Sequence, residues 1–455
     1  MNTMQIHQQE VICALATPSG VGAIAIIRVS GLGCIPIVNA IFKGKNLENV
    51  ETHTVHFGTI QSETGIIDEV LVSVFKSPKS FTKEDSVEIS CHGSDYIIRQ
   101  ILKLLVRNGA RIAKPGEFTQ RAFLNGQFDL VQAEAVADLI AADSEASHKT
   151  ALNQLRGGFS KKLTSLRTEL IHFASLIELE LDFGEEDVEF AGREDLRALI
   201  ESLQETISPL IESFDYGNAL KEGVPVAIIG SPNVGKSTLL NALLNEEKAI
   251  VTSVAGTTRD VIEDTIVLEG LKFRFIDTAG IRETTDLVES IGIARSRGAM
   301  EKADIVIFLF DSEETLQENR QLATEQAAGK DMFWVFNKID IAAEAYARIK
   351  EINPEVVGIS AHKQQGLDML TQVLVSRVHS QVATDTVVTN LRHYEHLLKT
   401  QEALSDVLHG LATGITGDFL AQDIRLSLHH LGEITGTIVT DDLLDNIFSK
   451  FCIGK

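Results

Sequence analysis

The stretch that decides the fold is GSPNVGKS, residues 230–237. It follows the apolar run Pro225–Ile229, which predicts a strand, and precedes Thr238–Leu244, which predicts a helix. In this setting the glycines let backbone N–H groups surround phosphate oxygens, and the start of the helix adds a favourable dipole. Lys236 is placed to reach the β- and γ-phosphates, and Ser237 to bind Mg²⁺. The stretch therefore predicts an α/β domain that binds a nucleoside triphosphate.

A second motif belongs to the same phosphate site. The predicted strand Phe273–Ile276 ends in DTAG, residues 277–280. We expect the Asp277 carboxylate near Mg²⁺ and the N–H of Gly280 near the γ-phosphate.

Two further segments predict that the base is guanine. The predicted strand Phe333–Phe336 is followed by NKID, residues 337–340. The Asp340 carboxylate can accept hydrogen bonds from N1–H and the 2-amino group of guanine, which adenine does not present in that arrangement. Ser360–Ala361 follow the predicted strand Val356–Ile359, where a backbone N–H can meet the guanine 6-oxo group. Four short motifs in this order, each at a strand end, predict GTP.

The residues that would hydrolyse GTP are less evident. Many small GTPases place Gln directly after DxxG to orient water, but here the residue is Ile281. Either hydrolysis is slow or another residue takes this role. GTTRD, residues 256–260, stands where a switch threonine would meet Mg²⁺; Thr258 is our choice, and Arg259 is as readily structural as catalytic. The segment after Ile281 is polar and suits a loop that carries a replacement acid or base; it includes Arg282, Glu283, Asp286 and Glu289.

The bulk composition limits the partners. The chain has 455 residues, room for two or three domains of roughly 100–200 residues each. A net charge of −23 argues against non-specific nucleic-acid binding over the whole surface. Residues 1–125 contain 12 Lys/Arg and 11 Asp/Glu, so the remainder carries −24. If RNA is a substrate, we expect a more basic partner to supply much of the phosphate contact.

The sequence predicts a cytoplasmic protein without membrane contact. No apolar run approaches the roughly 18 residues of a membrane span, and the first ten residues do not resemble a signal peptide. The four cysteines lie far apart without a CxxC pair, which argues against zinc and disulfides. Cys13, Cys34 and Cys91 are predicted to be packing residues.

Three compositional zones predict a multidomain α/β plus all-α architecture. Residues 11–125 indicate a mixed α/β unit, and residues 130–217 indicate long helices interrupted near 182–187. Residues 224–378 show the βαβ pattern of a parallel sheet, and the chain after 385 is predicted to be helical to its end. Within the first zone we expect strands at Ala23–Val29, Val70–Phe75 and Val87–Ser90 and a helix at Tyr96–Val106.

The zones predict that the nucleotide domain is inserted into a helical domain. The C-terminal helices cannot bury their apolar faces alone, and the earlier helices would supply partners. The predicted boundaries are residues 1–125 for the N-terminal domain, 126–217 and 381–455 for the two parts of the helical domain, and 218–380 for the nucleotide domain.

Beyond the nucleotide motifs, the C-terminal FCIGK, residues 451–455, points to a family. With ATPSGVGAIAIIRVSG (16–31), SFTKEDSVEISCHG (80–93) and KPGEFTQRAFLNGQFDL (114–130), the whole chain resembles the tRNA-modification GTPase MnmE (TrmE) family. The resemblance implies an N-terminal folate-binding domain, a helical domain and an inserted Ras-like P-loop GTPase domain. It also implies a homodimer that works with a flavin- and NADH-dependent partner, MnmG (GidA), to add a carboxymethylaminomethyl group to carbon 5 of the wobble uridine of certain tRNAs.

The resemblance also implies how hydrolysis is assisted. A potassium ion takes the place of an arginine finger, with ligands that match Asn233, Thr252, the Val254 carbonyl and Thr257, and oxygen ligands of this kind suit such a cation. Glu289 matches a glutamate that positions the attacking water through a second water. The expected Mg²⁺ ligands are Ser237 and Thr258. The residues expected around GTP and its ions are Asn233, Val234, Gly235, Lys236, Ser237, Thr238, Thr252, Ser253, Val254, Ala255, Gly256, Thr257, Thr258, Asp277, Thr278, Ala279, Gly280, Asn337, Lys338, Asp340, Ser360 and Ala361.

For the folate, 5,10-methylene-tetrahydrofolate or a formyl analogue, the resemblance implies contacts from Arg28 and Glu88, with the terminal Lys455 nearby. A third position is usually Lys in the family and is Gln127 here, which puts a charged contact to the glutamate tail in doubt. Cys452 is a candidate catalytic thiol beside the substrate, with a buried structural thiol as the alternative.

Two rival functions remain at this point. One is a regulatory RNA- or ribosome-associated GTPase switch, which would be expected to carry a basic RNA-binding domain. The other is a folate enzyme with a vestigial GTPase, which the intact nucleotide motifs disfavour.

Overall fold

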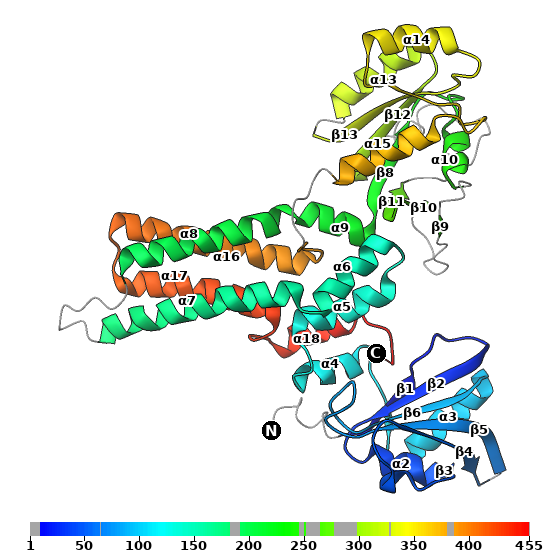
Figure 1. The fold of residues 1–455 in the computed structure, drawn as a ribbon, viewed down its shortest axis with the longest axis vertical. Helices are drawn as coiled ribbons and strands as arrows, with labels where there is room; N and C mark the ends of the chain where they lie inside the picture. Colours follow the sequence, from blue (N-terminus) through cyan, green and yellow to red (C-terminus); the bar gives the residue numbers. More distant parts are fainter. Residues whose placement is uncertain are drawn as a thin grey trace. The chain divides into compact units, whose positions relative to one another are not determined.

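The computed structural model describes residues 10–63, 65–182, 192–244, 250–251, 264–276, 298–326, 329–379 and 386–454. These residues form two compact units, coloured along the chain in Figure 1. One unit comprises the described residues of Met1–Ala137, Gln154–His172 and Leu428–Lys455, and the other those of Asp138–Asn153 and Phe173–Ser427.

The first unit contains a seven-stranded sheet in the order β3-β4-β5-β6-β2-β1-β7. Neighbouring strands run antiparallel, except β1 and β7, which are parallel. The predicted strands are present, each longer than expected. The strands are β1 (Ile12–Leu15), β2 (Gly22–Ser30), β3 (Phe42–Lys43), β4 (Thr54–Ser62), β5 (Gly65–Phe75), β6 (Ser86–Gly93) and β7 (Arg111–Ile112).

Two helices, α2 (Cys34–Ile41) and α3 (Asp95–Arg107), pack against one face of this sheet. Alternate residues of the central strands, such as Ile27 and Ile89, point into that layer because successive side chains of a strand point to opposite faces. Helix α3 extends the predicted helix by one residue at each end and buries Ile101 in the same core.

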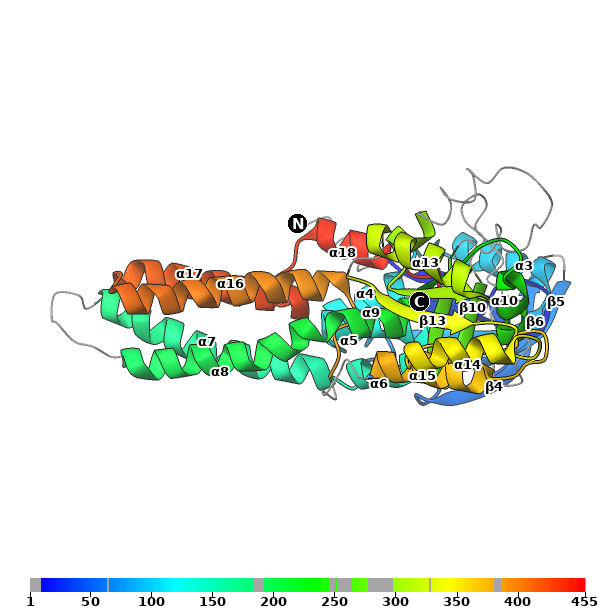
Figure 2. The same ribbon diagram turned by 90° about the horizontal axis from the view of Figure 1, so that it is seen from above.

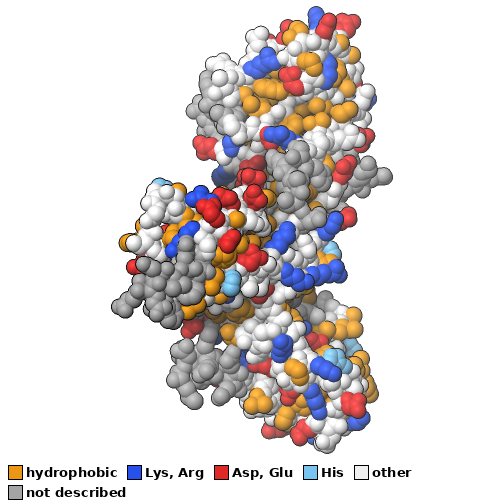
Figure 3. All heavy atoms as spheres, turned by 60° about the vertical axis from the view of Figure 1, so that its left-hand side comes forward, with side chains coloured by type: hydrophobic (Ala, Val, Ile, Leu, Met, Phe, Trp, Pro, Cys, Tyr) orange, Lys and Arg blue, Asp and Glu red, His pale blue; other side chains and the backbone are white. Residues whose placement is uncertain are grey.

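Side chains on the opposite face of β2, β4 and β5 are exposed and partly apolar. Phe57 and Leu71 pair directly across β4 and β5, and they are 66% and 48% exposed. Ile24 and Val55 on the same face are 67% and 59% exposed. Figure 3 shows hydrophobic side chains at the surface in its lower part, where the N-terminal sheet lies.

The end of the chain packs within this unit. Helix α18 (Asp441–Phe448) forms a small core with α5 (Leu130–Ala141) and with Phe123 of α4 (Glu117–Leu124). The prediction that helix continues to the terminus is wrong, because α18 ends at Phe448. Gly454 has φ +93° and its α-carbon faces the Leu15 carbonyl so closely that a Cβ would lie 2.2 Å from that oxygen, so glycine is required there.

The second unit contains a pair of antiparallel helices. Helices α8 (Arg193–Glu212) and α16 (Leu391–Thr413) lie side by side in Figures 1 and 2. Two polar contacts cross the pair, Gln204 to Ser405 and Gln401 to Ser208, at 2.9 and 2.8 Å. The other helices that belong wholly or partly to this unit are α6 (Glu145–Leu155), α7 (Gly158–Asp182), α9 (Phe214–Glu222) and α17 (Gly417–Thr435).

The second unit also contains a seven-stranded sheet in the order β14-β13-β12-β8-β11-β10-β9. The five strands from β14 to β11 are parallel, whereas β10 runs antiparallel to both β11 and β9. The parallel sheet that the βαβ pattern predicts is present in these five strands; β10 differs, because the short turn between β10 and β11 allows only an antiparallel pair. The strands are β8 (Val224–Ile229), β9 (Ile250–Val251), β10 (Asp264–Leu268), β11 (Leu271–Phe275), β12 (Ile305–Phe310), β13 (Asp331–Phe336) and β14 (Val357–Gly358), the last shorter than predicted.

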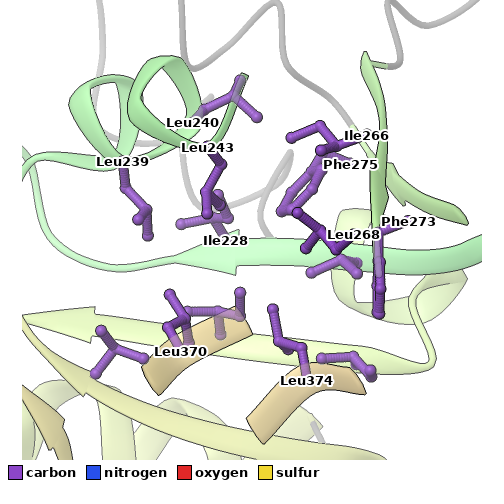
Figure 4. Packing of buried hydrophobic residues seen from close by; sticks show 14 of the residues in the cluster. Ile228, Leu239, Leu240, Leu243, Ile266, Leu268, Phe273, Phe275, Leu370 and Leu374 are labelled. Carbon is purple, nitrogen blue, oxygen red and sulfur yellow. The ribbon is translucent and has the colours of Figure 1, made fainter. Parts of the chain in front are cut away.

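Helices cover both faces of this sheet. Helices α10 (Lys236–Leu244) and α15 (Leu367–His379) bury their leucines against one face, as Figure 4 shows for Leu239, Leu243 and Leu370 around Ile228 and the strand phenylalanines. On the other face, Ala323 of α13 (Glu313–Gln326) joins a core with Phe308. Because strands β8 and β12 are buried from both sides, they are continuous apolar runs. Helix α14 (Ala343–Ile352) packs beyond β13.

The segment that precedes β8 contacts the segment that follows α15. The backbone N–H of Val388 donates to Ser213 Oγ at 3.1 Å, and the rings of Phe214 and Tyr394 stack with centroids 4.4 Å apart. Gly217 of α9 lies so close to this returning segment that a Cβ there would be 2.1 Å from the Val388 carbonyl oxygen. Segments before and after the sheet are thus held together.

The Gly217→Ala substitution should destabilise this contact. The added methyl group meets backbone, which cannot rotate away, so we expect a loss of about 1–3 kcal/mol in the free energy of unfolding. Urea unfolding followed by circular dichroism measures it. Gly298→Ala is the matched control, since no described atom lies within 4 Å of its added Cβ. Equal stability of the two variants would contradict the close approach.

Candidate functional site

The nucleotide-binding loop lies where β8 ends and α10 begins. Gly230 passes so close to β12 that a Cβ would lie 2.2 Å from the Leu309 carbonyl oxygen. Gly235 has φ +101°, and Asn233 has φ +62°, so the loop needs left-handed backbone at two positions. The glycines of the motif are therefore explained by close approach and by turn geometry, as a loop that wraps phosphates requires.

Lys236 lies over this loop. Its Nζ donates to the carbonyl oxygens of Gly230 and Ser231 at 2.7 and 3.0 Å. Burial lowers the pKa of the Lys236 ammonium from its usual value. The ammonium is thus held inside the curve of the loop, where an anion would compensate for its desolvation.

A buried amide joins the loop to the other nucleotide motifs. Asn337, which is 3% exposed, donates from Nδ2 to the Val234 carbonyl at 2.8 Å. Its Oδ1 accepts the backbone N–H of Ala361 at 3.0 Å. The segments 230–237, 337–340 and 360–361, which the sequence predicts to share one site, are therefore brought together. The Ala361 N–H serves this internal contact in the structure.

Lys338 adds a second link. Its Nζ donates to the Asn233 carbonyl at 3.0 Å and to Asp311 Oδ2 at 2.6 Å. Asp311 follows β12, and its part in the site was not predicted, because an acid after a strand has no spacing signature of its own. Asp340 is exposed at the end of the same turn, so its carboxylate is available to a ligand.

Several predicted residues lie outside the described residues: 252–258, 277–280, Glu289 and Lys455. The β10–β11 hairpin, which lies between residues 252–258 and 277–280 in the sequence, is described. Its Lys272 Nζ donates to Asp143 Oδ2 at 2.7 Å, and its Gly270 carbonyl accepts the N–H of Ala146. The strand that leads into residue 277 is thus fastened to the residues that begin α6.

A second group of predicted residues lies on the N-terminal sheet. Arg28 and Glu88 pair directly across β2 and β6, and Arg28 Nη2 lies 2.8 Å from Glu88 Oε1. The Arg28 guanidinium lies 5.4 Å from the ring centroid of Phe81 and 5.8 Å from that of Phe118. The sequence reasoning missed both rings, although each lies in a segment that carried the family resemblance. A guanidinium, a carboxylate and two aromatic rings can together bind a flat heterocycle with donors and acceptors.

Two further predicted folate residues, Gln127 and Cys452, are among the described residues. Gln127 is exposed and precedes Phe128, whose ring centroid lies 6.0 Å from that of Phe81. The exposed Cys452 is tied to the same domain by its carbonyl, which accepts the N–H of Gly116 at 3.3 Å.

Helix α4, which carries Phe118, is anchored by buried charges. Arg121 is 2% exposed and donates to Glu117 Oε1 at 3.0 Å and to the Glu10 carbonyl at 2.9 Å. Glu84 Oε2 lies 3.4 Å from Arg121 Nη1, and Arg111 binds both oxygens of Glu117. Burial acts to raise the pKa of the Glu117 carboxyl, but Arg111 and its hydrogen bonds lower it below its usual value.

The three remaining cysteines are buried, as predicted for packing residues. Desolvation raises the pKa of the Cys13 and Cys91 thiols to about 11 and raises that of Cys34 further. They are neutral thiols at neutral pH. No helix among the described residues is long and apolar enough to cross a bilayer.

Two family models match the chain. Residues 11–127 match the GTP-binding protein TrmE N-terminus, and residues 130–452 match the MnmE helical domain. A crystal structure of a variant of Aquifex aeolicus Era bound to GDP and AlF4⁻ covers 39% of this chain and 65% of its own at 26% identity, with a TM-score of 0.26.

Two curated relatives extend over the full length. The tRNA modification GTPase MnmE of Cytophaga hutchinsonii is 56% identical and covers 100% of this chain and 99% of its own. That of Flavobacterium johnsoniae is 52% identical over 98% of this chain and 99% of its own. Matches at this identity across all parts of the chain leave one assignment: the chain belongs to the tRNA modification GTPase MnmE family.

Proposed function

We propose that the chain hydrolyses GTP and, with an MnmG/GidA-type flavoprotein, adds the carboxymethylaminomethyl group to carbon 5 of the wobble uridine in certain tRNAs. The observation that carries the GTP part is the Asn337 amide, which ties the phosphate loop to the base-reading turn. The tRNA part is supported by full-length relatives named for tRNA modification. A regulatory RNA- or ribosome-associated switch is less supported, because residues 11–127 match the TrmE N-terminus.

In this proposal the base is read at the end of β13. Asp340 accepts N1–H and the 2-amino group of guanine, while Asn337 and Lys338 hold the turn against the phosphate loop. Ser360 and Ala361 stand beside the base, as the bond between Ala361 and Asn337 supports. A site that pairs with these donors rejects a base that lacks them by large factors.

Asp340→Asn is predicted to exchange guanine for xanthine, because an amide can donate to the 2-oxo group where a carboxylate only accepts. We expect GTP affinity to fall by at least about tenfold and affinity for xanthosine triphosphate to rise. Fluorescent-nucleotide titration measures both, with Asp368→Asn, an exposed acid of the same domain, as the matched control. Unchanged GTP affinity in Asp340→Asn would falsify the base assignment.

Two cations are proposed for the same site. Ser237 and Thr258 would hold Mg²⁺, and Asn233, Thr252, Thr257 and the Val254 carbonyl would hold K⁺. Among the described residues the fit is good: Ser237 stands in the first turn of α10. The Asn233 backbone is held in a left-handed conformation by Lys338, and no described residue bonds its exposed side-chain amide. Bound K⁺ would supply positive charge at the phosphates, and Glu289 would orient the attacking water.

GTP hydrolysis should be faster in potassium than in sodium, because Na⁺ is too small for the same ligands. We expect Asn233→Ala to lose most of this stimulation, about tenfold or more in kcat, with nearly unchanged GTP affinity. Ser231→Ala is the control, since its hydroxyl donates to Glu318 at 2.7 Å. Equal rates of the wild type in the two salts would argue against the cation mechanism.

The N-terminal site is proposed to hold 5,10-methylene-tetrahydrofolate or its formyl analogue. The donor set fits: Glu88 can accept from a pterin ring, and Phe81 and Phe118 flank Arg28. Bound folate would supply the one-carbon unit. Lys455 and Cys452 are proposed to approach it, with Cys452 as the candidate catalytic thiol.

We further propose a cytoplasmic homodimer that forms a larger complex with the flavoprotein. The exposed apolar side chains of Ile24, Val55, Phe57 and Leu71 on one sheet face support the dimer, because a second copy could cover them. A mass of one chain by light scattering at micromolar concentration would contradict it. The proposed domains are residues 1–125, 126–217 with 381–455, and 218–380, which the contact between Ser213 and Val388 supports.

Cells that lack the chain should lose the modified wobble uridines, since the chain is proposed to hold the folate that supplies the one-carbon unit. Mass spectrometry of tRNA nucleosides measures this loss. The wild-type gene should restore the modification, and Asp340→Asn should not. Wobble uridines that are unchanged in the deletion strain would remove the tRNA part of the proposal.

A further inference from the structure

The loop between β5 and β6, residues 76–85, presents lysines at the edge of the proposed folate site. Its sequence is KSPKSFTKED. Its two acids are used internally: Glu84 Oε2 accepts from Ser30, and Asp85 Oδ1 accepts the N–H of Ser77. With three lysines against two acids, the loop carries a net positive charge.

The backbone around Lys83 is held in place. Lys83 has φ +57°, and its carbonyl accepts from Ser77 Oγ at 2.8 Å. The preceding Thr82 is buried, with its Oγ1 2.7 Å from Ser30 Oγ and its carbonyl accepting from Asn125 at 2.7 Å. A backbone held on both sides fixes where the Lys83 side chain begins, which lowers the entropy lost when it binds a ligand.

The Lys83 side chain reaches the turn that contains Gln127. Its Nζ donates to the Gly126 carbonyl at 2.6 Å. Within the described part of the chain, no acidic side chain forms an ion pair with it. An ammonium has three N–H donors, so two donors and the full charge stay available to an anion beside Gln127.

The same loop joins this ammonium to the Arg28 group. Phe81 lies two residues before Lys83, and its ring is one of the two that the Arg28 guanidinium lies over. The ring of Phe128, next to Gln127, lies 6.0 Å from that of Phe81. A ligand that stacks on Phe81 with one end at Arg28 and Glu88 would thus have Lys83 within reach of its other end.

We propose that Lys83 binds the carboxylates of the folate glutamate tail and so supplies the charged contact that the neutral Gln127 cannot make. Lys83 thereby gives the site a preference for poly-γ-glutamyl folates. This inference rests on the proposed folate function. Each added γ-linked glutamate brings one more carboxylate, and Lys79 of the same loop is exposed, so a longer tail meets more positive potential. A phosphate of RNA could also meet Lys83, but the link through Phe81 favours the small ligand.

The test is titration calorimetry of the full-length protein with 5-formyltetrahydrofolate carrying one or five glutamates. For the wild type we expect the pentaglutamate to bind roughly three- to tenfold tighter, the range of a half-exposed charge-assisted contact. The preference should shrink as salt rises. In Lys83→Gln the ratio of the two folate affinities should be close to one. GTP hydrolysis should be unchanged, which would show that the fold is intact.

Two matched variants sharpen the result. Lys79→Gln removes the same charge from the same loop and should keep most of the preference, whereas Lys83→Gln combined with Gln127→Lys should restore it. If Lys83→Gln keeps the full preference, or if Lys79→Gln removes it equally, Lys83 is not the tail contact. Loss of tRNA affinity in Lys83→Gln with unchanged folate binding would assign it to RNA instead. If the wild type binds neither folate, the proposed folate function fails.

Discussion

The nucleotide site depends on one buried side-chain amide. Asn337 follows β13, accepts from Ala361 beyond β14 and donates to Val234 after β8. Leaving either buried group without a partner would cost about 1–3 kcal/mol, so the three turns share one arrangement. They can meet because β8, β12, β13 and β14 are parallel, which places the carboxyl ends of all four strands at the same edge of the sheet. The ion pair of Asp311 with Lys338 connects a fourth turn, the one after β12, to the other three.

The N-terminal unit uses buried charge for the same purpose. Arg121 ties helix α4 to Glu84 of the loop before β6, so Phe118 and Phe81 are fixed relative to each other. Arg28 lies over both rings as a result. Removing one partner from such a network would leave a buried charge without compensation, which is far more harmful than losing an exposed pair. In both units, buried polar groups hold in place the loops that carry the proposed ligand-binding residues.

Prediction from the sequence succeeded where the chemistry needs fixed residue types at short spacing. The glycines at 230 and 235 are such cases, because one lies against the Leu309 carbonyl and the other adopts φ +101°. Buried strands such as Ile305–Phe310 were also evident, since a run of six apolar residues leaves few alternatives. It did not foresee the antiparallel strand β10, whose direction follows from the short turn to β11, and it wrongly continued the helix beyond Phe448.

The sequence alone determined the strand–loop–helix of the phosphate site, the order of the guanine motifs and the family resemblance, because each is encoded within a few consecutive residues. Only the tertiary structure decided which distant groups meet: Lys83 with the turn before Gln127, Asp311 with Lys338, and Gly217 with the returning segment at Val388. No local pattern encodes such pairs. They arise when strands and helices pack, and residues far apart in the chain then share a surface whose hydrogen bonds must be satisfied.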